Sequence, residues 1–151
     1  MTCAVIGATL NICLTPQEAA HLVKEFCLWK DGGIDPGDYF GKDTAFMRPK
    51  SVVDAGIRKV HLETQSVTPA WNRMMGSGIK DPDRYTSDKI LVYVHLGDVK
   101  NTPYLLLAIL EPGHAQMSDP DLVRGLAVLY EDERSAFART FPDPQWITAG
   151  F

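Results

Sequence analysis

The sequence predicts an α+β domain, with a compact antiparallel sheet of three to four strands between an N-terminal and a C-terminal helix. Three observations favour this class. Apolar residues recur at helical spacing near both ends of the chain. Shorter apolar or alternating runs between them have the length of strands, and Gly- and Pro-containing segments separate the runs. The 151 residues fit one domain, which we expect to span 1–151.

The first expected elements are a strand and a long helix. Residues 3–13 are small and apolar with β-branched members, as in a strand. Thr15 can cap a helix in which Pro16 takes the first position and Glu18 completes a capping box. The glycines at 32–33 end that helix. Its apolar side chains recur at helical spacing and are Ala19, Leu22, Val23, Phe26 and Trp29.

The middle of the chain predicts loops around one strand. Residues 31–50 are rich in Gly, Asp and Pro and are expected to be mostly loop, followed by a short helix over 49–57. The run 58–63 alternates, which predicts a strand with His61 on its polar face. Residues 64–85 are expected to form a long polar loop, and loops of this length are often functional.

The second half predicts a hairpin and a closing helix. Residues 89–96 and 104–110 have the pattern of two strands, joined by a hairpin connection at 97–102. The second strand is apolar on both faces, as a covered central strand would be. A helix is expected to begin within 118–121, and residues 139–151 are expected to form an irregular tail.

Composition and charge narrow the function classes. Apolar residues make up 45% and charged residues 23% of the chain, and no apolar run approaches the roughly 20 residues of a membrane span. The N-terminus lacks a charged signal-peptide region, so a cytoplasmic location is expected. The net charge is −4, yet residues 41–84 carry 8 basic and 5 acidic side chains. Any contact with nucleic acid should therefore involve this middle segment, unless it is simply a solvated face.

Cysteines and familiar motifs exclude several chemistries. The 3 cysteines contain no Cys-x-x-Cys pair, which argues against a disulfide framework or a zinc site. The chain has no phosphate-binding loop, dinucleotide fingerprint or nucleophile elbow. Its histidines lack helical ligand spacing, although a metal site from His61, His95 and Asp88 stays open.

Three polar residues at strand ends are candidates for acid–base chemistry. His114 follows a strand and a Pro-Gly turn, where an imidazole would be exposed on a rigid support. Asp88 begins one strand and Tyr93 lies within it. Each has a structural alternative: an exposed loop histidine, an Asx turn and a packed tyrosine. In the long loop, Trp71 and Arg73 suit a base stack and a phosphate contact, or a simple anchor.

In ordered pieces between Leu14 and Arg134, the chain resembles the YafO family of toxins from type II toxin–antitoxin systems. One departure lies in the last helix, where relatives usually have Phe-Arg and this chain has Glu133 before Arg134. The pieces that carry the resemblance are Leu14-Thr15, Glu18, Leu22, Phe26, Lys30-Asp31-Gly32-Gly33, Phe40-Gly41-Lys42-Asp43, Val60-His61-Leu62, Thr86-Ser87-Asp88, Leu91-Val92-Tyr93, Leu105-Leu106, Ala108-Ile109-Leu110, Pro112, His114-Ala115, Asp119, Glu131 and Arg134.

The resemblance implies a RelE-like fold and a ribosome-dependent mRNA endoribonuclease that uses no metal or other cofactor. In such cleavage the ribose 2′-OH attacks the neighbouring phosphate and the 5′-oxygen leaves, which requires proton transfer and a cation. A cognate antitoxin, the ribosome and mRNA would be the partners. We expect His114 to transfer protons, Asp88 and Tyr93 to assist, and Arg73 or Arg134 to stabilise the phosphate. The expected RNA-binding residues are Lys42, Lys59, His61, Trp71 and Arg84.

Two alternatives to this function remain. The chain could be a RelE-like binding module, or a degenerate toxin, that inhibits by occupying its target without cutting RNA. It could also be a small-molecule hydrolase that uses His114 and Asp88, in which case both should converge in a deep apolar pocket.

Overall fold

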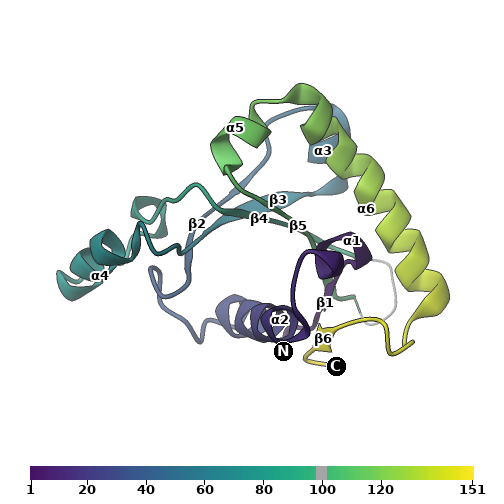
Figure 1. The fold of residues 1–151 in the computed structure, drawn as a ribbon, viewed down its shortest axis with the longest axis horizontal. Coiled ribbons are helices and arrows are strands. Elements are labelled where there is room, and N and C mark those ends of the chain that lie inside the picture. Colours follow the sequence, from purple (N-terminus) through teal and green to yellow (C-terminus); the bar gives the residue numbers. More distant parts are fainter. Residues whose placement is uncertain (98–101) are drawn as a thin grey trace.

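A six-stranded sheet with helices on both faces forms the centre of the structure, a computed structural model that describes residues 1–97 and 102–151 (Figure 1). The strand order is β2-β3-β4-β5-β1-β6. The strands are β1 (Ala4–Ile6), β2 (Phe40–Ala45), β3 (Arg58–Leu62), β4 (Ile90–His95), β5 (Tyr104–Leu110) and β6 (Thr148–Ala149). The helices are α1 (Ala8–Ile12), α2 (Pro16–Lys30), α3 (Lys50–Ala55), α4 (Thr68–Gly76), the 3₁₀ helix η1 (Pro82–Arg84), α5 (Gly113–Met117) and α6 (Pro120–Thr140).

The α+β class is confirmed, but the sheet is larger than the three to four strands predicted. Strands β2 to β5 form an antiparallel meander. The opening strand β1 lies beside β5 in parallel, and β6 pairs with β1 in the antiparallel sense. Sequence patterns predict where a strand lies more readily than which strand pairs with it. The parallel partner of β1 lies about a hundred residues away in the chain.

Helix α2 covers one face of the sheet and begins as its sequence predicts. Thr15 accepts the backbone N–H of Glu18, whose carboxylate accepts the N–H of Thr15, which completes the capping box. Leu22 and Phe26 are buried against strand residues of the same core, including Tyr93. Successive strand residues point to opposite faces, so this core contains only every second side chain of β4.

Helix α6 covers the opposite face together with α3 and α5 (Figure 1). Asp119 caps it by accepting the N–H groups of Asp121 and Leu122. On α6, Glu133 is 5% exposed and accepts the N–H groups of Ala8 and Thr9 at 2.9 and 3.0 Å. The carboxylate thus satisfies the first free amides of α1, which gives the glutamate at this position a structural role.

Several segments expected to be irregular contain regular elements. Strand β2 lies in the predicted 31–50 loop, and α4 and η1 occupy the predicted 64–85 loop. Helix α6 runs past the expected start of the 139–151 tail, and that tail contributes β6 to the sheet. The hairpin connection expected at 97–102 falls mostly outside the described residues.

Candidate functional site

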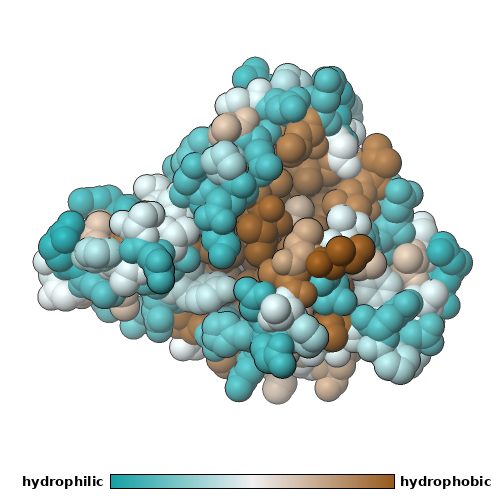
Figure 2. All heavy atoms as spheres, viewed as in Figure 1, coloured by the Kyte–Doolittle hydropathy of each residue, from teal (hydrophilic) through white to brown (hydrophobic). Residues whose placement is uncertain are grey.

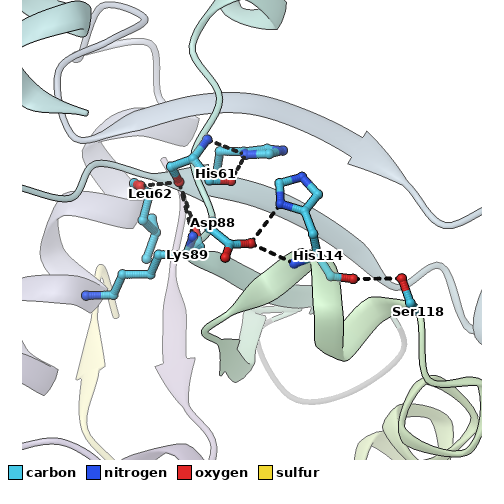
Figure 3. A network of polar contacts seen from close by, with 7 residues as sticks. His61, Leu62, Asp88, Lys89, His114 and Ser118 are labelled. Carbon is cyan, nitrogen blue, oxygen red and sulfur yellow. Dashed lines mark hydrogen bonds and ion pairs between the residues drawn. The ribbon is translucent and has the colours of Figure 1, made fainter. Parts of the chain in front are cut away.

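The start of β4 and the start of α5 bring Asp88 and His114 together (Figure 3). The Oδ1 atom of Asp88 lies 2.7 Å from Nδ1 of His114 and accepts the backbone N–H of His114 at 2.8 Å. These hydrogen bonds hold the pKa of Asp88 below its usual range, and the backbone N–H has the largest effect. With its Nδ1 atom engaged, His114 leaves Nε2 for a substrate, and its side chain is 65% exposed.

Close packing of the turn before α5 positions this pair. The backbone N–H of Gly113 donates to the carbonyl of Asp88 at 2.7 Å, and a Cβ at this glycine would lie 2.4 Å from the side chain of Ile90. Only glycine therefore allows α5 to approach β4 so closely. On the other side, the buried hydroxyl of Ser87 donates to the carbonyl of Leu62 at 2.6 Å and ties the residues before β4 to β3.

A second imidazole, that of His61 on β3, lies beside this pair. The ring centroids of His61 and His114 are 5.9 Å apart (Figure 3). The Nδ1 atom of His61 lies 2.8 Å from both the amide nitrogen and the carbonyl oxygen of Ser87, so either protonation state of Nδ1 has a partner. Burial lowers the pKa of His61, and the charges of His114, Lys42 and Lys59 lower it further. A neutral imidazole is therefore fixed next to an exposed one.

Two of the expected RNA-binding cations lie on this side of the sheet. Lys59 precedes His61 by two residues on β3, so the two side chains share one face of the sheet. Lys42 on β2 is half-buried, and burial together with Lys42 lowers the pKa of Lys59. Among the residues that the structure describes, neither lysine forms an ion pair with a carboxylate. Both charges are therefore available to a bound anion.

Tyr93 is not part of this site. It is fully buried on the opposite face of the sheet, where its hydroxyl donates to Asp43 at 2.6 Å and accepts from Lys30 at 2.9 Å and Arg58 at 3.3 Å. Burial and Asp43 raise its pKa. We call Lys30, Asp43, Arg58 and Tyr93 the tyrosine cluster. Adjacent side chains of one strand face opposite ways, and Tyr93 faces away from His114.

The two arginines expected to contact phosphate lie away from the Asp88–His114 pair. Arg73 is exposed on α4, which projects from the sheet beside η1 and away from α5 (Figure 1). Arg134 is half-buried on α6, about 21 Å along the helix from Pro120. The structure therefore does not bring either guanidinium to the imidazoles.

The remaining expected RNA-binding residues divide in the same way. Trp71 is 1% exposed, stacks edge-on against Tyr85 and donates its indole N–H to the carbonyl of Thr86 at 3.1 Å. It anchors α4 and offers no face to a base. Arg84 is exposed on η1, which lies beside β2.

The open alternatives find little geometric support. His95 is at the far end of β4, about 23 Å along the chain direction from Asp88. In residues 1–97 and 102–151, no group of three or more His, Cys, Asp or Glu is arranged to hold a metal ion. Neither described cavity is lined by Asp88 or His114, as a small-molecule hydrolase would require. No helix in the described part of the chain has the length and apolarity for a membrane span.

One of those cavities has a mixed lining and the other is cationic. The mixed cavity, of about 340 Å³, lies between α1 and β5, and its wall combines apolar residues such as Leu107 with the charged Glu18, Lys89 and Glu111. Figure 2 shows brown, apolar surface over the middle of the molecule in this view. The cationic cavity, of about 590 Å³, lies between the end of β2, β3 and the start of α6. Arg48 and Arg124 line it, and the sequence offered no motif that pointed to either.

Comparison with known proteins identifies one family. The model of a family described as "Toxin YafO, type II toxin-antitoxin system" matches residues 27–134, which include every residue of the site. No curated protein and no solved structure is significantly similar to the chain.

Proposed function

This chain belongs to the YafO family of toxins from type II toxin–antitoxin systems, and we propose that it is a ribosome-dependent mRNA endoribonuclease of RelE-like fold that blocks translation. Membership of a type II system implies a cognate antitoxin as partner. The observation that carries the enzymatic proposal is the pair of adjacent imidazoles, of which His114 has a carboxylate partner.

Cleavage through the ribose 2′-OH requires two proton transfers. His61, whose pKa burial lowers, is neutral at pH 7 and suits removal of the 2′-OH proton. The resulting oxygen forms a bond to phosphorus, and the bond from phosphorus to the 5′-oxygen breaks. His114, whose Nδ1 atom lies 2.7 Å from the Asp88 carboxylate and whose Nε2 is left for the substrate, supplies a proton to that leaving oxygen. The products are a 2′,3′-cyclic phosphate and a 5′-hydroxyl.

Charge stabilisation falls to the two lysines. Negative charge increases on the phosphate oxygens as the new bond forms, and cations aimed at it lower the barrier. The charges of Lys42 and Lys59 both lower the pKa of His61, and Lys59 shares its face of β3. They replace Arg73 and Arg134 in this role.

The test is to map RNA 5′ ends after brief induction of the wild type and of His114→Ala, with translation running and with translation blocked. We expect cuts only during translation, and a loss of about 10²–10⁴-fold in His114→Ala. His21→Ala, which changes an exposed histidine on α2, is the control and should cut normally. Growth arrest without new RNA ends would instead identify a binding module, and wild-type cutting by folded His114→Ala would refute the proposed site.

The two imidazole roles can be separated with a modified substrate. Sulfur in place of the 5′-oxygen at the cut position leaves without a proton. Such an mRNA should restore cleavage by His114→Ala and leave His61→Gln inactive. Rescue of His61→Gln alone would reverse the two assignments.

A further inference from the structure

The cationic cavity has the chemistry of a nucleotide site. Its apolar wall includes Phe46, Met47 and Met117, and its charged groups are Arg48, Lys59 and Arg124. A volume of about 590 Å³ lies within the range of about 300–1,000 Å³ that small-molecule sites occupy. An apolar wall beside several cations matches a ligand with a flat ring system and an anionic group.

The charges of the cavity are only partly neutralised. Arg124 pairs with Asp121 one helical turn earlier. For Arg48 and Lys59, no carboxylate within the described ranges lies at ion-pairing distance. The ammonium group of Lys59 instead lies 4.6 Å from the centre of the Phe46 ring, and burial lowers its pKa. An anion bound here would contact two cations that have no other negative partner.

Two residues of the cavity wall are neighbours of the imidazole site. Lys59 lines the cavity and is two residues from His61 on the same face of β3, a separation of about 6.6 Å. Ser118, also in the cavity wall, donates its hydroxyl to the carbonyl of His114 at 2.9 Å. A strand bound across the imidazoles would therefore reach the cavity with its next nucleotide.

We infer that this cavity binds the nucleotide next to the cleaved bond, with the base against Phe46, Met47 and Met117 and its phosphate at Arg48 and Lys59. The inference deepens the proposed function, since it makes the cavity the part of the site that selects the base. RNA is favoured over an acidic protein segment because Lys59 and Ser118 place the cavity beside the imidazoles.

Methionine methyl groups provide a direct test. Two of the 5 methionines, Met47 and Met117, line the cavity, whereas Met74 and Met75 lie on α4. Protein with ¹³C-labelled methionine methyls would be titrated with each of the four nucleoside 3′-monophosphates and with inorganic phosphate. We expect the signals of Met47 and Met117 to move, with different affinities for the four bases, and those of Met74 and Met75 to stay.

Two variants complete the test. Arg48→Ala should weaken nucleotide binding about tenfold, as expected for loss of a charge-assisted contact. Lys50→Ala removes a cation that is paired with Asp54 outside the cavity, and should bind as the wild type does.

Three results would overturn the inference: unmoved Met47 and Met117 signals, equal effects from phosphate alone, or a response of these signals only to the purified antitoxin. The measurement records binding and no cleavage. Nucleotide binding by a protein that cuts no RNA would leave the cavity assignment intact and refute the proposed function. RNA cutting by a protein whose Met47 and Met117 signals do not move would support the proposed function and refute the cavity assignment.

Discussion

Replacing Tyr93 by phenylalanine separates a structural from a catalytic role for this residue. The hydroxyl that this change removes donates to Asp43 and accepts from Lys30 and Arg58. It lies on the face of the sheet opposite to His114. We therefore expect Tyr93→Phe to lower stability and to leave RNA cutting per folded molecule unchanged.

The expected loss follows from what remains in the tyrosine cluster. A hydrogen bond to a charged group contributes about 1.5–3 kcal/mol. Without the hydroxyl, Asp43 still has Arg58 at 3.4 Å and Lys30 at 3.8 Å, so no charge is left unpaired. The penalty of about 3–5 kcal/mol for an orphaned buried charge therefore does not apply. We expect a loss of about 2 kcal/mol, which lowers Tm by about 4–8 °C in a chain of this size.

Urea unfolding at pH 7 would measure this loss, with Tyr104→Phe as the control. Tyr104 packs on Tyr93 with ring centroids 5.9 Å apart, but its hydroxyl has no hydrogen bond to the described residues. Its variant should be nearly as stable as the wild type. A Tyr93→Phe protein of unchanged stability that has lost RNA cutting would show that Tyr93 acts in the reaction, and would refute our placement of the site.

Three further changes test other contacts. Glu133→Ala should lower the free energy of unfolding, measured in urea, by about 3–5 kcal/mol, because two amides of α1 lose a buried carboxylate, and Glu133→Gln should lower it about half as much. A loss below about 1 kcal/mol for Glu133→Ala would contradict the capping role. Because burial lowers the pKa of His61, protonation of this residue opposes folding, and the wild type should lose stability as pH falls below about 6.5. The free energy of unfolding of His61→Gln should change less steeply with pH, and equal slopes would argue against a buried neutral imidazole. Gly41→Ala should destabilise the protein strongly, because its Cβ would lie 2.1 Å from the carbonyl oxygen of Tyr85. A Tm of this variant equal to that of the wild type would show that the backbone relaxes easily at this position.

Local patterns were sufficient for the longest elements. The capping box at Thr15 and the helical spacing after it predicted α2, and the apolar run at 104–110 predicted β5 within a residue or two. These elements carry their signals within one stretch of sequence. Strand β2 has no such local signal, because Gly41 and Asp43 are residues typical of loops. Their place in a strand is explained by pairing with β3 and by the tyrosine cluster.

The sequence predicts the proximity of some candidate site residues and not of others. Lys59 and His61 share one face of β3, as the alternation at 58–63 predicts, whereas Lys42, Asp88 and His114 come from β2 and from segments outside the strands. The positions of Trp71, Arg73 and Arg134 depend on packing between elements, and the sequence patterns do not predict that packing. A tryptophan in an expected loop suggested a stacking surface, whereas Trp71 is buried against Tyr85 and anchors α4.

The position of β1 in the sheet has a consequence for synthesis of the protein. Ala4 pairs with Tyr104 on one side and with Ala149 on the other, so β1 has no neighbour in the sheet until β5 has been made and lacks its second neighbour until β6 has been made. Contacts this far apart in sequence form slowly. The sheet is therefore complete only after β6 has been synthesised and has reached the edge of β1.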